Sequence, residues 1–239
     1  AASDVYKRQG QRRRVMGRVV SVASQPGGIV DVTCDLGPQW PGHRAGQFAF
    51  VTFDRGEGAH PFTIASAPGA TPGRLRFKIK ALGDYTRRLA DTLTPGQAVA
   101  VEGPYGRFEQ PLQASAGPQV WVAGGIGITP FLAWLEDRQA RAGDGAPVWL
   151  HYCVRDAQAE PMVDAVAQRC QALGNVTLQV HDARHRLTAA DLAQGAVAAG
   201  RVADIWFCGP TGLSASLRRG LRRLGQGGVR WHQEAFDMR

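Results

Sequence analysis

The residues best suited to chemistry lie in the segment VAGGIGITPF, residues 122 to 131. A buried strand is predicted to run into Gly124, Gly125 and Gly127, and a helix capped by Thr129, with Pro130 in its first turn, follows at once. Glycines let the backbone approach a ligand closely, and a helix N-terminus offers free N–H groups to a phosphate. We interpret this segment as a binding site for a dinucleotide pyrophosphate. The alternative is a tight strand-to-helix turn without a ligand.

A second turn of this kind is WFCGPTGL, residues 206 to 213. It ends a predicted strand at Cys208 and passes through Gly209 and Pro210 into a helix. Ligands of doubly wound sheets sit beyond the carboxyl ends of the strands, so this turn can share a crevice with the glycine-rich turn. Taken alone, Cys208 would be interpreted as a core thiol.

A third turn, KIKALGDYTRRL, lies far from the other two, at residues 78 to 89. It ends a strand at Gly83 and begins a helix near Thr86. An ordinary helix start would explain the spacing, but a second phosphate-type turn in the other half of the chain indicates two nucleotide ligands.

The stretch AHPFTIASAP, residues 59 to 68, has strand composition but contains Pro61. Proline donates no hydrogen bond to a β ladder, so it is expected at an edge, a bulge or a strand start. His60 before it, and Phe62 and Thr63 after it, make the segment a candidate binding element as well as a strand.

Composition excludes several classes of function. The net charge is +8, but the basic residues are scattered and no aromatic residues are interleaved with them, so nucleic-acid binding is not expected. The exceptions to this scatter are three groups, namely Arg12-Arg13-Arg14, Arg87-Arg88 and a helical set of Arg218, Arg219, Arg222 and Arg223. The 4 cysteines form no C-x-x-C pair, which argues against a zinc site or other metal centre and against an iron–sulfur cluster. No window is apolar enough to suggest a membrane span.

The elements that must position these residues fall into two halves. Up to residue 112, short alternating runs separated by Gly and Pro predict an antiparallel β-barrel, starting at residue 14. From residue 118 to 239, strands and helices alternate, which is typical of an α/β doubly wound parallel sheet. Residues 1–13 are interpreted as a tail or a truncated junction.

Six motifs in order carry a resemblance to a known family: HPFTIAS, LGDYT, GPYG, GGIGITP, CGP and the ending EAFDMR. They resemble the ferredoxin–NADP reductase superfamily over residues 14 to 239. The resemblance implies an FAD-binding β-barrel domain over 14–112 and an NAD(P)-binding α/β domain over 118–239. It implies a flavin-dependent NAD(P)H oxidoreductase, in which hydride passes from NAD(P)H to FAD and single electrons then pass to an external acceptor.

The resemblance also assigns roles to residues of the first half. Phe62 would lie against the flavin ring and the Thr63 hydroxyl near its N5, while His60 stands where the family usually has arginine. The remaining residues expected to contact FAD in this half are Pro61, Lys78, Ile79, Lys80, Gly83 and Thr86, of which Gly83 and Thr86 would hold the pyrophosphate.

In the second half, the nicotinamide nucleotide would be held by the two glycine turns described above, with Cys208 and Gly209 beside the nicotinamide. Glu234 and Phe236 resemble the acidic and aromatic positions that lie close to the flavin ring. The residues expected to act in catalysis are Thr63, Cys208, Glu234 and Phe236.

The choice between NADPH and NADH depends on Arg155 and Asp156, which follow the second predicted strand of the α/β half. Arginine can pair with a 2′-phosphate, whereas an acidic side chain prefers the free 2′-hydroxyl. We expect NADPH, with NADH as the alternative.

The electron acceptor is suggested by HPFTI, which resembles the membrane-anchored branch of the family, the ferric reductases and NADPH oxidases. This resemblance implies a dehydrogenase portion at the cytoplasmic face of a membrane, passing electrons to the haem of a transmembrane domain. A soluble, cytoplasmic ferredoxin- or flavodoxin-type NAD(P)H reductase is the first alternative. A regulatory module that binds flavin or nucleotide without turnover is the second.

Overall fold

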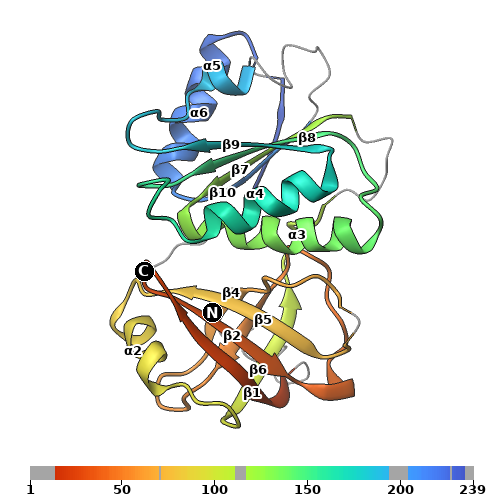
Figure 1. The fold of residues 1–239 in the computed structure, drawn as a ribbon, viewed down its shortest axis with the longest axis vertical. Coiled ribbons are helices and arrows are strands. Elements are labelled where there is room, and N and C mark those ends of the chain that lie inside the picture. Colours follow the sequence, from red (N-terminus) through yellow and green to blue (C-terminus); the bar gives the residue numbers. More distant parts are fainter. Residues whose placement is uncertain (1–13, 70, 111–116, 194–203, 227, 235–239) are drawn as a thin grey trace, which may run out of the picture. The chain divides into compact units, whose positions relative to one another are not determined.

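The computed structural model describes residues 14–69, 71–110, 117–193, 204–226 and 228–234 (Figure 1). The chain divides into two compact units, residues 1–109 and residues 110–239. The predicted N-terminal tail and Phe236 lie outside the described residues.

The described part of the first unit contains a six-stranded sheet in the order β4-β3-β6-β1-β2-β5, in which paired neighbours are antiparallel. Its strands are β1 (Arg14–Gln25), β2 (Ile29–Asp35), β3 (Phe48–Thr52), β4 (His60–Thr63), β5 (Arg74–Lys80) and β6 (Ala98–Tyr105). A 3-10 turn η2 (Gly37–Gln39) follows β2, and helix α2 (Asp84–Thr92) follows β5.

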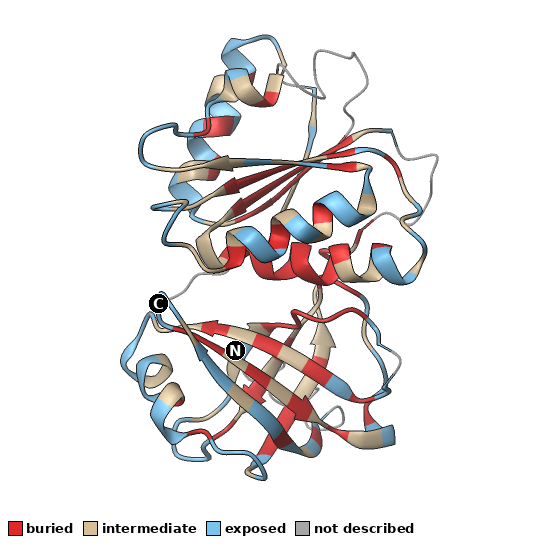
Figure 2. Cartoon of the chain, in the orientation of Figure 1, coloured by how far each residue is buried: buried red, intermediate tan, exposed pale blue. Residues whose placement is uncertain are grey.

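The two outer strands of this sheet meet, so the sheet closes into a barrel. Ile64, directly after β4, forms a bridge with Phe77 of β5, and the Ala65 N–H donates to the Arg76 carbonyl at 2.8 Å. Alternation along β5 turns Phe77 and its apolar neighbours inward and Arg76 outward, as expected for a period of two. The closed barrel buries one contiguous apolar core (Figure 2).

The second unit contains a parallel sheet, whose described strands run in the order β11-β10-β7-β8-β9. The strands are β7 (Gln119–Gly124), β8 (Val148–Cys153), β9 (Val176–His181), β10 (Asp204–Cys208) and β11 (Arg230–Glu234). The helices are η3 (Gly125–Ile128), α3 (Thr129–Ala140), α4 (Met162–Leu173), α5 (Ala189–Leu192) and α6 (Thr211–Arg223). The chain builds outward from β7 to β9 and then returns to place β10 on the other side of β7. The topological switch point, where such sheets bind ligands, therefore lies between β7 and β10.

Helices cover both faces of this sheet, with α3 and α4 on one face and α5 and α6 on the other (Figure 1). The alternation of β7 decides which residue meets which layer. Val122 packs in a cluster with Leu217 and Leu221 of α6, whereas Trp121 meets Trp134 of α3 with ring centroids 4.9 Å apart. The predicted fold class, an antiparallel barrel followed by a doubly wound parallel sheet, is confirmed.

Candidate functional site

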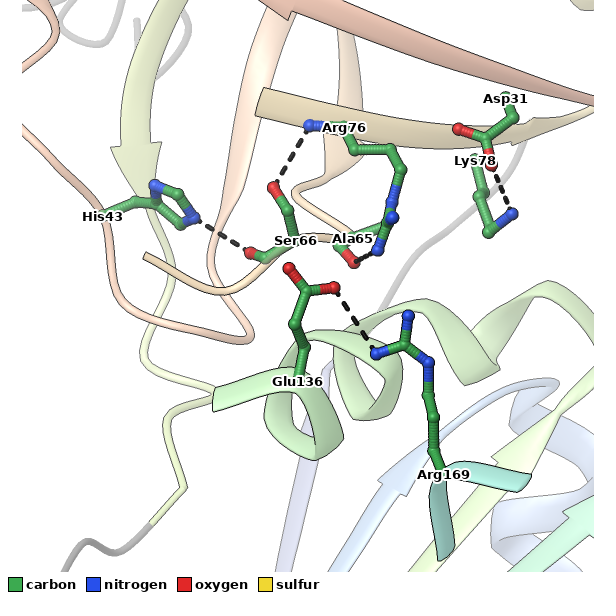
Figure 3. Close-up of polar contacts among 8 residues, drawn as sticks. All are labelled: Asp31, His43, Ala65, Ser66, Arg76, Lys78, Glu136 and Arg169. Carbon is green, nitrogen blue, oxygen red and sulfur yellow. Dashed lines mark hydrogen bonds and ion pairs between the residues drawn. The ribbon is translucent and has the colours of Figure 1, made fainter. Parts of the chain in front are cut away.

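Strand β4 of the first unit is held in place by the segment that follows it (Figure 3). The His43 ring donates from Nε2 to the Ser66 carbonyl at 3.0 Å, and the Arg76 backbone N–H donates to the Ser66 hydroxyl at 3.1 Å. The Arg76 guanidinium also donates to the Ala65 carbonyl at 3.3 Å. These contacts hold the crossing from β4 to β5, while the ladder with β3 sets the register of His60 to Thr63.

His60 and Phe62 share one face of β4 and form an aromatic stack with helix α2. The rings of His60 and Tyr85 are stacked with centroids 4.3 Å apart, and Phe62 lies 6.4 Å from His60. The Nε2 atom of His60 is buried and has no hydrogen-bond partner among the described residues. A buried polar atom of this kind is costly unless it is satisfied, so the site suits a ligand that carries a polar group to His60.

Pro61 and Thr63 lie on the opposite face of β4, because side chains alternate along a strand. Pro61 pairs with Phe50 and Thr63 with Phe48 in the ladder with β3. Pro61 is exposed at the start of the strand, where its missing N–H is tolerated, whereas Thr63 is only 8% exposed. The Thr63 side chain is therefore almost completely buried, and little of its surface is open to a ligand.

The predicted flavin-contacting residues of β5 point in two directions. Ile79 is 1% exposed, so its side chain belongs to the barrel core, and a contact between Ile79 and a ligand would be made by its backbone. Lys78 faces outward, but its ammonium donates to Asp31 at 2.5 Å across the β2–β5 ladder (Figure 3). Lys80 also faces outward and is partly exposed.

The helix start after β5 differs in detail from the prediction. Gly83 is the N-cap and α2 begins at Asp84, which places Thr86 at the third helical position. The Thr86 hydroxyl accepts from the Leu82 and Gly83 N–H groups at 2.9 and 3.0 Å and donates to the Gly83 carbonyl at 3.1 Å. Thr86 therefore shapes the turn, while the N–H groups of Asp84 and Tyr85 have no intrahelical acceptor and can face a phosphate.

In the second unit, the two predicted glycine turns pack directly on one another at the switch point. A Cβ on Gly127 would lie 2.7 Å from the Cys208 carbonyl carbon and 3.1 Å from the Gly209 nitrogen. A Cβ on Gly124 would lie 2.6 Å from Pro210 Cδ, and one on Gly209 would lie 2.9 Å from the Gly124 nitrogen. These three glycines are required because two backbone turns approach each other, whether or not a ligand is bound.

Gly125 is different, and it marks the open side of the turn. Its φ of +54° favours glycine, yet a Cβ there would meet nothing within 4 Å. The predicted cap is wrong: Thr129 is the first residue of α3, and its hydroxyl donates to the Ile126 carbonyl at 3.0 Å. The 3-10 turn η3 lies between the strand and α3 and moves the helix start past Gly127, with Pro130 buried in the first turn.

Cys208 and Glu234 are brought side by side by the register of β10 and β11. Burial, with a contribution from the Glu234 carboxylate, raises the pKa of the Cys208 thiol to about 12. Burial also raises the pKa of Glu234 to about 7. Cys208 is therefore a neutral thiol under ordinary conditions, and Glu234 can exchange a proton near neutral pH.

Arg155 follows β8 and is exposed, at the same edge of the sheet as Gly124, which pairs with Cys153 of β8. Its carbonyl accepts from the Ala183 N–H at 3.4 Å, while the neighbouring Asp156 carboxylate accepts from the Gln158 N–H at 3.0 Å. The Asp156 carboxylate therefore stabilises the turn that contains it, and the Arg155 guanidinium forms no ion pair with a residue that the structure describes.

Sequence reasoning missed Tyr85, which stacks on His60 and lies in the helix turn after Gly83. The signal was present, because Tyr85 stands inside the LGDYT motif. Burial, together with the nearby carboxylates of Glu57 and Asp54, raises the pKa of its phenol to about 12, so the ring stays neutral.

Comparison with known proteins agrees with this geometry. Residues 14–109 match a family described as FAD-binding domain. The chain is 32% identical over 163 residues to Ferric reduction oxidase 7, chloroplastic, of Arabidopsis thaliana, covering 59% of this chain and 21% of that protein. It is also 32% identical over 183 residues to the ferredoxin–NAD(+) reductase component of the alkene monooxygenase system of Xanthobacter autotrophicus, covering 72% of this chain and 54% of that protein.

The chain has the two-unit fold of the ferredoxin–NADP reductase superfamily. The flavohaem-like FAD/NAD-binding domain of nitric oxide dioxygenase from Vibrio cholerae has the same fold, with a TM-score of 0.74 and 19% identity, covering 93% of this chain and 98% of that one. The similarity to Ferric reduction oxidase 7 supports the predicted link to ferric reductases. The similar curated proteins include reductase components of bacterial monooxygenase systems.

The chain spans 21% and 54% of the two curated relatives described above. None of the described helices is long and apolar enough to cross a membrane. The described residues also contain no cluster of three or more side chains that could hold a metal ion.

Proposed function

We propose that this chain is the flavin- and nucleotide-binding portion of an NAD(P)H oxidoreductase. The observation that carries the proposal is the packing of two glycine turns at the switch point of the second unit, which leaves Gly125 open. In a chain with this fold, whose residues 14–109 match an FAD-binding domain, this is the expected place for the nicotinamide nucleotide. The domain assignments 14–112 for FAD and 118–239 for NAD(P) are part of the same proposal.

When bound, FAD supplies the hydride and single-electron chemistry, and the chain's own residues orient and shield it. His60 would satisfy its buried Nε2 on a polar group of FAD, and Phe62 and Tyr85 would provide apolar surface around it. The Thr63 hydroxyl would hydrogen-bond a ring nitrogen, and the helix start after Gly83 would hold the pyrophosphate.

The residues of the second unit would then hold and orient the nucleotide. The backbone at Gly125 would approach the pyrophosphate, and the neutral Cys208 would form a small, uncharged wall beside the nicotinamide. Glu234, whose pKa is raised to about 7, would hold or release a proton next to Cys208. The predicted role of Phe236 belongs to this proposal as well.

The experiment that tests the proposal is anaerobic reduction of the FAD-reconstituted chain by NADPH, monitored as the loss of visible flavin absorbance. Thr63→Ala should slow reduction with little change in nucleotide affinity, and Thr63→Ser, which keeps the hydroxyl, should restore most of the rate. A chain that cannot be reconstituted with FAD would instead favour the regulatory module without turnover. Equal reduction rates for all three proteins would remove Thr63 from the mechanism.

A preference for NADPH is proposed from the exposed guanidinium of Arg155. Arg155→Ala should lower kcat/KM for NADPH by about tenfold to a hundredfold, as expected for the loss of one charged hydrogen-bonding partner, and should leave NADH nearly unchanged. Arg184→Ala, at an exposed arginine in the loop after β9, is the matched control. Equal effects on both nucleotides would contradict this role.

For the acceptor, we propose the haem of a transmembrane domain of the ferric-reductase type, at the cytoplasmic face of the membrane. The support is the similarity to Ferric reduction oxidase 7 and the HPFT sequence of β4. The similarity to a ferredoxin–NAD(+) reductase component favours a soluble electron carrier as the second candidate. Steady-state reduction of ferredoxin, flavodoxin and a haem protein by the same preparation separates these acceptors.

A further inference from the structure

The exterior of helix α6 carries a group of arginines that the proposed function does not use. Arg218, Arg219, Arg222 and Arg223 are all exposed, while Leu217 and Leu221 and the other inner residues of the helix are buried (Figure 2). None of the four arginines forms an ion pair with a residue that the structure describes. We call these four residues the α6 arginine face.

Local stability explains only part of this cluster. Arg222 and Arg223 lie in the last turn, where cations favour the helix dipole, and Arg218 lies over the Trp231 ring at 5.9 Å. Arg219 neither lies in the last turn nor has a described contact with an aromatic ring. Arg218 with Arg222, and Arg219 with Arg223, are like charges four residues apart, a spacing that destabilises a helix, and α6 contains no acidic residue.

The arginine face is also separate from the nucleotide site. It begins 7 residues after Thr211, the first residue of α6, and ends at Arg223. At about 1.5 Å per residue, the four arginines lie roughly 10 to 18 Å along the helix from Thr211, which directly follows the Gly209–Pro210 turn. They are therefore placed to meet something other than the nucleotide pyrophosphate.

We propose that the α6 arginine face binds an anionic phospholipid surface. Four guanidinium groups on a convex helix are complementary in charge to a plane of anionic headgroups, and this attraction requires no shaped partner. A protein partner would be expected to bury an apolar or aromatic centre, whereas the outward residues beside the arginines are small, namely Thr211, Ala215 and Ser216. Leu224, 50% exposed directly after the helix, is too isolated to supply that centre.

The test is co-sedimentation of the full chain with vesicles of phosphatidylcholine, with and without phosphatidylserine, in low and high salt. Each basic residue near an anionic surface contributes about 1 kcal/mol, or roughly fivefold in affinity, so R219E/R223E should weaken binding by at least about 25-fold. The matched control is R55E/R107E, which removes two exposed arginines from the first unit with the same change in net charge.

Binding that requires phosphatidylserine, weakens in high salt and is lost only in R219E/R223E would support the proposal. No binding of the unaltered chain in low salt, equal binding to both kinds of vesicle, or an equal loss in the two variants would overturn it. Thermal unfolding of the variants checks that both remain folded, which is expected because all four substituted side chains are exposed. None of these measurements depends on turnover, so the result stands apart from the proposed enzyme activity.

Discussion

Replacing Gly127 with alanine tests the packing of the two glycine turns in the second unit. The new Cβ would lie 2.7 Å from the Cys208 carbonyl carbon and 3.1 Å from the Gly209 nitrogen. Both are backbone atoms that cannot rotate away, so the turns must separate. Overpacking costs about 1–3 kcal/mol, and the lower entropy of the unfolded alanine chain returns about 0.4–1 kcal/mol. Because backbone atoms obstruct the site, we expect a net loss near the upper end, about 2 kcal/mol.

The unfolding of this unit can be followed by tryptophan fluorescence, because Trp40 is the only one of the 6 tryptophans in the first unit. With a typical urea m-value of about 2 kcal/mol per molar, Gly127→Ala should lower the urea midpoint by about 1 M. The rate of flavin reduction by NADPH should fall as well, since the turns that position the nucleotide are moved apart.

Gly125→Ala is the matched control, since it adds the same methyl group two residues away. The left-handed conformation costs alanine about 1–2 kcal/mol, partly offset in the unfolded chain, and no atom lies within 4 Å of the new Cβ. We expect a smaller drop in the urea midpoint but a clear rise in KM for the nucleotide, because the methyl group occupies the open side of the turn. A Gly127→Ala midpoint equal to that of the unaltered chain, or above that of Gly125→Ala, would refute the reasoning.

Three further predictions concern buried charge. Burial and the neighbouring His181 lower the pKa of His151 from 6.5 to about 4, so the free energy of unfolding is unaffected by this group above pH 6.5 and falls as the pH drops toward 4. In a Glu234→Gln background the second unit should lose about 2 kcal/mol between pH 7 and pH 5, and adding His151→Asn should reduce that loss in urea titrations. Burial raises the pKa of Glu234 to about 7, so the stability that the protonated carboxyl gives the folded unit is lost as the pH rises through 7. Glu234→Gln should therefore raise the urea midpoint at pH 8 and leave it nearly unchanged at pH 4. A lower midpoint at pH 8 would contradict the burial of this carboxyl. Asp31→Asn removes the carboxylate that pairs with the Lys78 ammonium, whose side chain is only 12% exposed, and should destabilise the first unit by about 2 kcal/mol. The double variant Asp31→Leu/Lys78→Met should regain stability in circular dichroism melts, and no recovery would argue against a true ion pair.

Much of the architecture could be predicted from the sequence because it depends on local patterns. Alternation with a period of two, together with Gly and Pro punctuation, indicated the barrel, and strand–helix alternation indicated the parallel sheet. The glycines at 124, 125 and 127 marked the turn because glycine permits a close approach of backbone segments and, at Gly125, a positive φ. These signals are contained within about ten residues of chain, so no knowledge of distant contacts was needed.

The details that the spacing predicted wrongly or left open depend on how a short segment packs against distant parts of the chain. Thr129 has the composition of a helix cap, but the 3-10 turn η3 moves it to the first helical position. For Ile79, the spacing did not decide whether the side chain or the backbone would face a ligand, and the structure shows that the barrel closes over the side chain and leaves it 1% exposed. Helix phase and strand direction set these outcomes, and a one-residue change in either reverses which side chain faces a ligand.

Residue order alone therefore determined two units, their fold classes and the positions of the glycine turns, because these follow from short-range periodicity and glycine geometry. Only the tertiary structure separated Gly127, required by the carbonyl of Cys208, from Gly125, which faces open space. Only the tertiary structure placed Tyr85 on His60 and left the buried Nε2 of His60 without a partner. The physical reason is that these relationships join residues brought together by β register and helix packing, and neither property is written in the spacing of a single segment.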